Sequence, residues 1–249
     1  MHVDVYKTHK ITANECLFSL LDTYIPTLQE KSILVVTSKI VSLCEGSFVK
    51  KESVSSKEAL IQSHADAFLD YPLDSTSSHA VQLTIKNNIL IPSAGIDESN
   101  GNGLYILYPK NIQQSALTIW QYIRKRDSLQ QLGILISDSH TTPMRRGVLG
   151  LGLGWCGFNP VYNYIGKPDC FGSLLRMTKV NNLDALAASA VFCMGEGNEQ
   201  TPFAVITGAP KIIYSPIPPT AEEMKEVTIS LQEDLYAPLL KNAPWIFNK

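Results

Sequence analysis

Residues 32–38 read SILVVTS, a short apolar run rich in β-branched side chains, and such a run predicts a buried strand. A second run, LGILI at residues 132–136, predicts another buried strand, which leads directly into the polar triplet SDS. Around these two runs, strands and helices follow one another without the strict alternation of a βαβ pattern. The sequence therefore favours an α+β fold over a doubly wound parallel sheet.

Further elements flank the two runs. A turn at Asn87-Asn88 joins two strands into a hairpin, and the clearest amphipathic helix ends at Gly195, with Asn182 as its N-cap. The expected helices span 58–70, 115–126 and 183–194, and the expected strands span 80–85, 89–91 and 203–207. Three cations close the second helix, at the negative end of its dipole. We expect one main domain over residues 1–215, then a linker and one C-terminal amphipathic helix over residues 216–249.

The composition narrows the class of protein. The chain has 249 residues, of which 45% are apolar and 18% are charged, and its net charge is −2. This length and apolar content exclude a disordered chain and allow a sizeable core. The near-neutral net charge excludes a protein that binds nucleic acid mainly through an excess of positive charge, because such binding depends on many Lys and Arg contacts to phosphates. A globular enzyme that acts on small molecules is the class that remains.

The cysteines indicate a reducing environment. They stand at positions 16, 44, 156, 170 and 193, an odd number without a CxxC pair, which argues against a disulfide framework and a structural zinc site. We expect Cys156 and Cys193 to lie in apolar surroundings as core residues. Charged residues among the first twenty positions argue against a signal peptide, so the expected location is the cytoplasm.

Residues 147–166 carry no charge over a length that could span a bilayer. Six glycines and Pro160 would break a helix there, so we expect a buried strand and a loop, without contact to a membrane. The GxGxxG pattern in this segment is followed by FNP, where a dinucleotide site requires a helix. On a strand, the glycines at 150, 152 and 154 would share one bare face, which admits either a ligand or a closely packed backbone.

Three polar segments combine carboxylates, hydroxyls and glycine, and each directly follows an expected strand or helix. Mg²⁺ and Mn²⁺ prefer oxygen ligands and take one or two carboxylates together with substrate phosphates. The first and third segments lack His and Cys, which disfavours zinc. The alternative is that Asp, Asn, Ser and Gly simply form turns here. The segments are GIDESN at 95–100, SDS at 137–139 and MGEGN at 194–198.

Two adjacent arginines, Arg145 and Arg146, follow the second polar segment. The guanidinium fork matches the oxygens of a phosphate, so the pair is a candidate phosphate clamp. A solvated basic turn is the alternative. His140 stands between these arginines and the triplet SDS, either as a contact to substrate or as a plain loop histidine.

The motifs resemble those of the coenzyme F420-0:L-glutamate ligases, a family of γ-glutamyl ligases. The resemblance covers residues 33–208, and GIDESN together with the SDS and RRG segments carries it most specifically. The other resembling segments, in the order of the family, are VVTSKIVS at 35–42, EG at 45–46, GKPDCFG at 166–172, MGE at 194–196 and Pro202.

This resemblance implies a GTP-dependent ligase that uses Mg²⁺ or Mn²⁺, at two sites, to join L-glutamate to a carboxylate of a larger acceptor. It also implies an intertwined homodimer with mixed, largely antiparallel sheets and flanking helices. The γ-glutamyl ligase domain would be residues 1–215, as one unit or as two intertwined subdomains. The implied metal ligands are Asp97, Asp138, Ser139 and Glu196. The implied nucleotide contacts are Ser38, Lys39, Asn100 and the loop from Met194 to Thr201, including Gly195, Glu196, Gly197 and Asn198.

We hypothesise an acyl phosphate mechanism, in which the acceptor carboxylate attacks the γ-phosphate and the glutamate amine then displaces phosphate. Asp97 and Asp138 would act as catalytic residues through bound metal, which neutralises charge during transfer. Arg145 and Arg146 would steady phosphate or the acidic acceptor.

Two departures from the family leave the acceptor open. Leu43 stands where the family usually has a lysine, and Thr141-Thr142 replace a usual Gly-Arg pair. A folate is therefore an alternative acceptor to coenzyme F420-0, because its glutamate tail is also extended through a γ-carboxylate. A catalytically silent nucleotide-binding module is the third alternative, although such a module has no need of three oxygen-ligand segments.

Overall fold

The computed structural model of the protein describes residues 1–70 and 81–248. Among these residues, no helix combines the length and apolar character that crossing a membrane requires. The elements follow one another in the order β1 (His2–Tyr6), α1 (Leu17–Tyr24), β2 (Ser32–Thr37), α2 (Ser38–Glu45), β3 (Phe48–Lys50), η1 (Lys51–Ser53), α3 (Lys57–His64), β4 (Ala67–Leu69), β5 (Leu83–Lys86), β6 (Ile89–Pro92), η2 (Ser93–Gly95), β7 (Leu104–Ile106), α4 (Ile112–Asp127), β8 (Leu132–Thr141), β9 (Val148–Cys156), β10 (Val161–Asn163), β11 (Lys179–Asn181), α5 (Asn182–Met194), β12 (Phe203–Thr207), α6 (Ala221–Val227), α7 (Ala237–Leu240) and β13 (Trp245–Phe247).

The two apolar runs form β2 and β8, neighbours in a five-stranded sheet with the order β1-β12-β2-β8-β9. β2 and β8 pair in parallel, whereas the other neighbours in this sheet pair antiparallel. A smaller sheet, β13-β4-β5-β6, is antiparallel throughout. The expected α+β class with mixed, largely antiparallel sheets is therefore confirmed.

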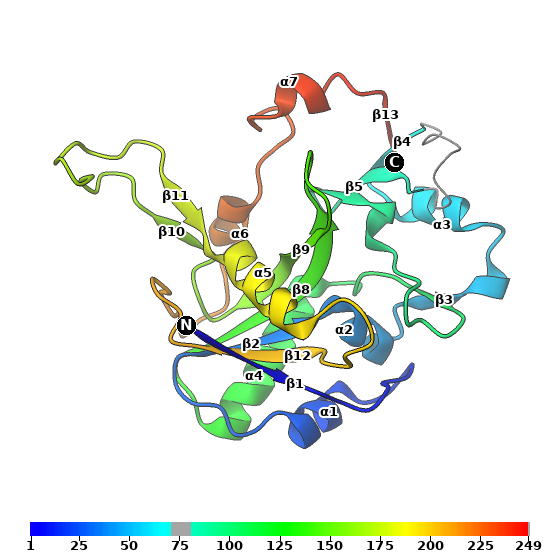
Figure 1. Ribbon diagram of the computed structural model, residues 1–249, viewed down its shortest axis with the longest axis horizontal. Coiled ribbons are helices and arrows are strands. Elements are labelled where there is room, and N and C mark those ends of the chain that lie inside the picture. Colours follow the sequence, from blue (N-terminus) through cyan, green and yellow to red (C-terminus); the bar gives the residue numbers. More distant parts are fainter. Residues whose placement is uncertain (71–80, 249) are drawn as a thin grey trace.

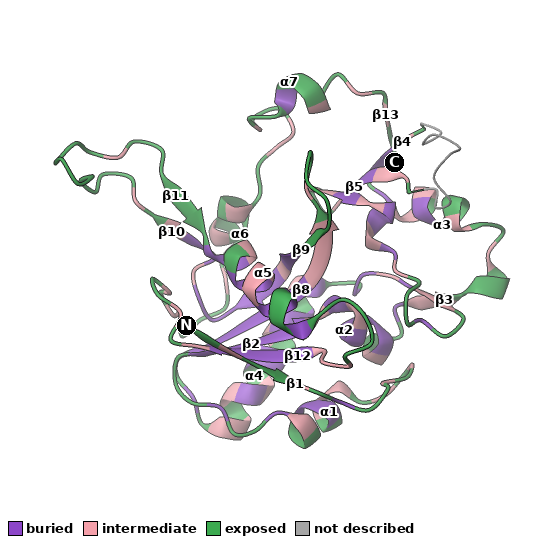
Figure 2. Ribbon diagram, viewed as in Figure 1, coloured by how far each residue is buried: buried purple, intermediate pink, exposed green. Residues whose placement is uncertain are grey.

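Helices cover both faces of the five-stranded sheet (Figure 1). Successive side chains of a strand point to opposite faces, so Leu34 and Val36 of β2 pack with α4, whereas Ile33 and Val35 pack with α5. All four side chains are fully buried, and the centre of the sheet is the most deeply buried part of the molecule (Figure 2). A separate apolar cluster joins α3, β4 and η2 beside the smaller sheet.

Several predicted elements are confirmed. The hairpin at Asn87-Asn88 joins β5 to β6, although Ala80 of the expected first strand lies outside the described residues. The strand 203–207 is β12, and residues 147–166 form β9, β10 and a loop. α5 buries the predicted apolar face and ends at Gly195, but its N-cap is Asn181, whose side chain accepts a hydrogen bond from the Asp184 N–H.

Other predictions of secondary structure are wrong. The helix expected over 58–70 ends at His64, because the residues that follow form β4 and pair with β5. The helix expected to begin at 115 begins at Ile112, capped by the Asn111 side chain. The tail holds two short helices, α6 and α7, and the strand β13, which returns to pair with β4 (Figure 1). The division of the chain after residue 215 stays a prediction.

The glycines of β9 pack against helices. A Cβ on Gly150 would lie 2.3 Å from the Ala187 carbonyl oxygen, and one on Gly152 would meet Leu183, both in α5. A Cβ on Gly154 would instead meet Ile112 of α4, on the opposite face of the sheet. The expectation of one shared face is wrong because the register of β8 against β9 shifts between Ile136 and Ser137. Close helix packing, not a ligand, explains these glycines.

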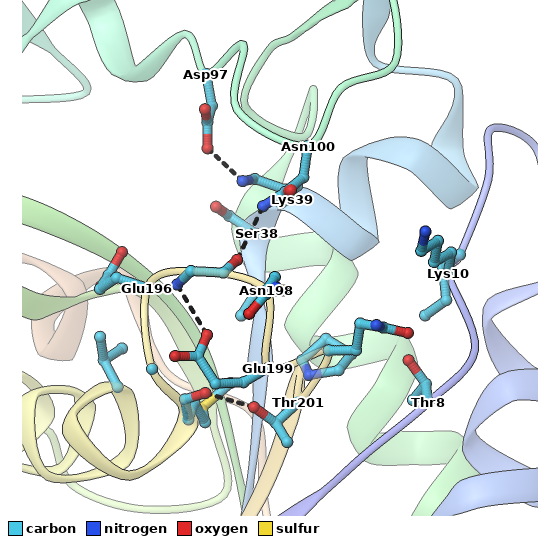
Figure 3. A pocket seen from close by; sticks show the side chains of 18 of the residues that line it. Thr8, Lys10, Ser38, Lys39, Asp97, Asn100, Glu196, Asn198, Glu199 and Thr201 are labelled. Carbon is cyan, nitrogen blue, oxygen red and sulfur yellow. Dashed lines mark hydrogen bonds and ion pairs between the residues drawn. The ribbon is translucent and has the colours of Figure 1, made fainter.

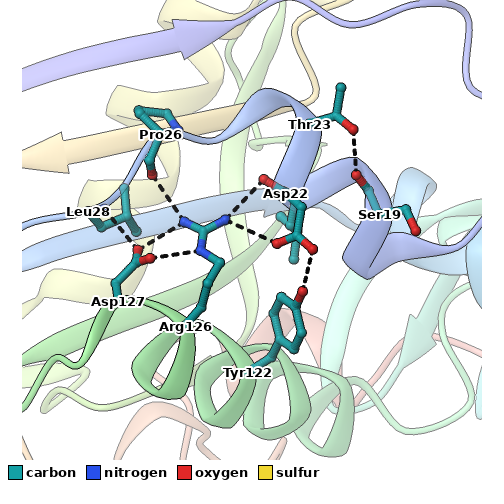
Figure 4. Close-up of polar contacts among 9 residues, drawn as sticks. Ser19, Asp22, Thr23, Pro26, Leu28, Tyr122, Arg126 and Asp127 are labelled. Atoms are coloured by element: carbon teal, nitrogen blue, oxygen red, sulfur yellow. Dashed lines mark hydrogen bonds and ion pairs between the residues drawn. The ribbon is translucent and has the colours of Figure 1, made fainter.

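Arg126 joins the end of α4 to the loop after α1 (Figure 4). Its guanidinium donates to both carboxylate oxygens of Asp127, at 2.8 and 2.9 Å, and to the carbonyl oxygens of Leu21 and Pro26, at 3.1 and 3.0 Å. Asp127 also accepts from the Leu28 N–H at 2.8 Å, and its side chain is only 3% exposed. The arginine thus does more than complement its own helix dipole.

The Arg126→Ala variant should lose about 3 kcal/mol in free energy of unfolding, because Asp127 would be left buried without its cation. The neighbouring exposed cation provides the control, since Lys125→Ala removes the same charge from the same helix turn and should change stability by less than about 0.5 kcal/mol. Urea denaturation of both variants measures the difference. Equal losses would show that the helix dipole, not the ion pair, accounts for the effect.

Candidate functional site

A pocket of about 840 Å³ lies where the ends of β2, β8 and α5 meet the segment after η2. Eleven of the predicted site residues line it: Ser38, Lys39, Asp97, Asn100, Asp138, Ser139, Met194, Gly195, Glu196, Gly197 and Asn198. The three polar segments identified from the sequence therefore all line one cavity.

The first wall of the pocket is the start of α2. Because α2 begins directly after β2, Thr37, Ser38 and Lys39 all line the pocket. Thr37 is the N-cap residue, yet its side chain makes no capping hydrogen bond to the helix. The positive end of the helix dipole and the backbone N–H groups of the first turn are therefore available to an anion.

The second wall carries Asp97, held by its backbone and its side chain. Its N–H and carbonyl oxygen pair with Ile106 at 2.9 and 2.8 Å. Its carboxylate accepts from the Ser99 N–H and hydroxyl and lies 2.5 Å from the Lys39 ammonium (Figure 3). Burial raises the pKa of Asp97, but Lys39 and Ser99 lower it more, so the net pKa lies below the usual value. The carboxylate is an anion at neutral pH.

Asp138 and Ser139 lie inside β8, not in a loop after it, so that part of the prediction is wrong. The strand continues to Thr141 through the register shift between Ile136 and Ser137. The Ser137 hydroxyl is buried and has no hydrogen-bond partner among residues 1–70 and 81–248. The Asp138 carboxylate accepts from the Tyr108 hydroxyl at 2.8 Å. Burial raises the pKa of Asp138 to about 6, although the Tyr108 hydrogen bond lowers it.

The third wall is the loop that follows α5. Gly195 ends the helix at a φ of 81°, and the Thr201 hydroxyl donates to the Met194 carbonyl oxygen. The Gly197 N–H donates to Glu199 at 2.8 Å, and the Asn100 side-chain amide donates to the Gly197 carbonyl oxygen at 3.1 Å (Figure 3). The last contact ties this loop to the one that bears Asp97.

Glu196 is the third predicted metal-binding carboxylate that lines the pocket. Burial raises its pKa above the usual value, and its interaction with the Ser139 side chain lowers it. Within residues 1–70 and 81–248, no three His, Cys, Asp or Glu side chains lie close enough together to hold a metal by themselves. The donors are nonetheless all oxygens, and Mg²⁺ usually takes one or two carboxylates and completes its shell with water and substrate phosphates. The residues fit such a shared site.

The arginine pair stands apart from this pocket. Arg145 and Arg146 are exposed at the tip of the β8–β9 hairpin, and His140 lies below them on β8; none of the three lines the pocket. Leu43 does not line it either, because its side chain is buried in the core beside α4. The role of the arginines stays a prediction.

The cysteines lie away from the chemistry. All five are free; Cys156 is buried, as expected, but Cys193 is exposed, because it lies on the side of α5 that faces away from the sheet. Desolvation by burial raises the pKa of the Cys156 thiol to about 12. A buried thiol that resists ionisation is no nucleophile.

Sequence reasoning missed part of the pocket lining. The segment from Thr8 to Thr12 lines the pocket (Figure 3). The Thr8 N–H donates to the Gln200 carbonyl oxygen at 2.8 Å, so the pairing of β1 with β12 carries this segment to the α5 loop. No local motif marks it, since its position depends on that long-range pairing.

Comparisons with known proteins point to one family. A family model described as F420-0:gamma-glutamyl ligase matches residues 6–208. The chain is 30% identical to the coenzyme F420:L-glutamate ligase of Methanococcus maripaludis over 240 residues, covering 91% of this chain and 93% of that protein. It is also 30% identical to the proteins of the same name from Methanothermobacter thermautotrophicus, covering 74% of this chain and 77% of that protein, and from Methanocaldococcus jannaschii, covering 73% and 77%.

The Gly195→Ala variant tests the geometry of the α5 loop. An added Cβ would lie 2.5 Å from the Glu199 carboxyl carbon, so Glu199 must swing away and release the Gly197 N–H. We expect faster hydrogen exchange at the Gly197 amide. Gly166→Ala is the control, because Gly166 has the same φ of 81° but open space around its Cβ.

Both variants should lose about 1–3 kcal/mol of stability, because a φ of 81° favours glycine. Only Gly195→Ala should change exchange in the α5 loop, as read by mass spectrometry of deuterated peptides. Unchanged exchange at Gly197 in that variant would mean that the contact to Glu199 does not hold the loop.

Proposed function

The chain belongs to the F420-0:gamma-glutamyl ligase family, and we propose that it joins L-glutamate to a carboxylate of an acceptor of the coenzyme F420-0 type, using GTP and a divalent metal ion. As a member of this family the protein is an enzyme that forms an amide bond. The observation that carries the finer proposal is one pocket that unites the N-terminus of α2 and the Lys39 ammonium with the carboxylates of Asp97, Asp138 and Glu196.

The charges of the pocket suit a nucleotide triphosphate with metal. The start of α2 and Lys39 offer a helix dipole and an ammonium to the phosphates. The Thr8 and Lys10 end of the pocket is then left for the sugar and base (Figure 3). We assign the phosphates to the end that holds Lys39, because its ammonium lies there beside the Asp97 carboxylate.

Asp97, Asp138, Ser139 and Glu196 would hold Mg²⁺ or Mn²⁺, in one or two sites that the phosphates complete. Bound metal would neutralise the charge that develops on the phosphates during transfer. Negative groups facing one cavity would otherwise repel a triphosphate. The donor set therefore supports metal-assisted chemistry more than simple anion binding.

The proposed reaction has two steps. An oxygen of the acceptor carboxylate attacks the γ-phosphorus, the bond to the β-phosphate oxygen breaks, and an acyl phosphate and GDP result. The glutamate amine then attacks the acyl carbon, loses a proton and displaces inorganic phosphate, which leaves an amide. Lys39 would steady the phosphoryl oxygens in the first step, so catalysis is mainly positioning and electrostatic stabilisation.

A homodimer is part of the proposal, and exposed apolar side chains support it. The arm formed by β10, β11 and the residues between them projects from the molecule and is exposed over most of its length (Figure 2). Phe171 and Met177 on this arm are 92% and 88% exposed. We propose that these side chains pack against a second copy of the chain, since large exposed apolar patches mark protein interfaces. We place the enzyme in a reducing cytoplasm, in keeping with its five free cysteines.

The identity of the acceptor calls for a direct assay. The purified enzyme is incubated with GTP, Mg²⁺ and L-glutamate, together with coenzyme F420-0, with a folate, or without acceptor, and the release of phosphate and the mass of the product are followed. We expect phosphate release and a product heavier by one glutamate residue with coenzyme F420-0. A product formed with folate but not with coenzyme F420-0 would show that the acceptor is a folate. Nucleotide binding without any product would identify a silent module.

The Asp97→Asn variant should lower acceptor-dependent GTP turnover by at least about a hundredfold, because it removes a proposed metal ligand while its side-chain oxygen can still accept from Ser99. Asp234→Asn is the control: the Asp234 carboxylate makes the same type of turn with the Tyr236 N–H, in the tail outside the pocket lining. It should leave turnover unchanged. Wild-type turnover in Asp97→Asn would refute the role of this carboxylate.

A further inference from the structure

Tyr108 lies behind the wall of the pocket. Its side chain is buried in the core beside α4, and it is absent from the pocket lining. Its hydroxyl donates to Oδ2 of Asp138 at 2.8 Å, so it contacts a carboxylate that does line the pocket. Tyr108 can therefore influence a ligand in this pocket through the residues that it contacts, such as Asp138.

The same short stretch of chain also fixes Asp97. Ile106, two residues before Tyr108, exchanges two backbone hydrogen bonds with Asp97, at 2.9 and 2.8 Å. The backbone of one carboxylate residue and the side chain of another are thus attached to residues 106–108. Because these attachments are two residues apart, the stretch sets the separation between Asp97 and Asp138.

The packing of Tyr108 requires Gly95. A Cβ on Gly95 would lie 2.2 Å from Cζ of the Tyr108 ring, closer than any real contact allows. Gly95 also has a φ of 70°, which favours glycine. It stands two residues before Asp97, so the ring packs directly on the segment that carries this carboxylate. Tyr108 thus contacts the polar segments at 95–100 and 137–139, although it does not line the pocket itself.

We propose that Tyr108 is a positioning residue, which holds the Asp138 carboxylate by one oxygen so that the other is presented to the divalent metal at a fixed separation from Asp97. This inference rests on the proposed function, since it takes Asp138 as a metal ligand. Partners that orient a metal-binding carboxylate typically contribute about tenfold or more to metal affinity, because a free carboxylate must lose rotational freedom when it binds. The phenol ring and its hydroxyl have separate tasks: the ring fills space against Gly95, and the hydroxyl orients Asp138.

The Tyr108→Phe variant removes the hydroxyl and keeps the ring. In the presence of GTP, we expect its affinity for Mn²⁺, measured by electron paramagnetic resonance, to fall by about tenfold or more. The kcat should also fall, while KM for L-glutamate should stay unchanged. The matched control is Tyr122→Phe, because the Tyr122 hydroxyl also donates to a carboxylate, Asp22, at 2.5 Å, in the Arg126 network (Figure 4). It should leave Mn²⁺ affinity and kcat unchanged.

The melting temperature of each variant shows whether a loss of Mn²⁺ affinity arises at the site or from general destabilisation of the fold. Wild-type Mn²⁺ affinity in Tyr108→Phe would overturn the positioning role and leave the proposed function intact. Equal weakening of Mn²⁺ binding in Tyr108→Phe and Tyr122→Phe would also overturn it, because the effect would then be general loosening. If the wild-type protein itself binds no Mn²⁺ with GTP, the proposed function fails, and the inference fails with it.

Discussion

The parallel pairing of β2 with β8 is the contact on which the candidate site depends. In its register, Thr37, the last residue of β2, lies opposite Ser137 of β8. The residues that follow them, Ser38 and Asp138, therefore lie at the same end of the sheet. Beyond this point β2 turns into α2, whereas β8 continues through its register shift. A helix N-terminus and a carboxylate therefore stand side by side. Ligands of sheets with parallel strands bind at such carboxyl ends.

The other two walls are brought to this point by different parts of the fold. One face of α5 packs on the five-stranded sheet, and Glu196 lies in the loop that follows this helix. Asp97 follows η2, which packs in the apolar cluster beside the smaller sheet. The Lys39–Asp97 ion pair and the Asn100–Gly197 hydrogen bond join the three walls. Asp97, Asp138 and Glu196 thus come from three elements that are far apart in the sequence.

The charge balance takes on a particular meaning in the proposed reaction. A chain with a net charge of −2 has no large excess of basic residues with which to bind a triphosphate and a polycarboxylate acceptor. The positive charge would come instead from bound metal, Lys39 and the dipole of α2. The carboxylates around the pocket then contribute to the slight negative balance and serve the binding of anions through metal.

Much of the fold and of the candidate site could be predicted from the sequence. The features that could not be predicted share one physical cause. The buried strands and α5 carry a local signal, namely apolar periodicity, and they are confirmed. The three polar segments are marked by carboxylates and turn-forming residues, and all three line the pocket. Three other features depend on pairing with a neighbouring strand. β8 extends beyond Asp138, Gly154 faces the side of the sheet opposite to Gly150 and Gly152, and residues 67–69 form β4. The contact from Tyr108 to Asp138 joins residues 30 positions apart. Single-sequence patterns carry no record of such pairings.

A crystal structure of the enzyme with Mn²⁺ and a non-hydrolysable GTP analogue would test the proposed site most directly. The anomalous signal of manganese identifies the metal positions independently of the nucleotide. We predict manganese between the nucleotide phosphates and the carboxylates of Asp97, Asp138 and Glu196, with Lys39 beside the same phosphates. A nucleotide bound outside this pocket, or manganese away from these carboxylates, would contradict the proposal.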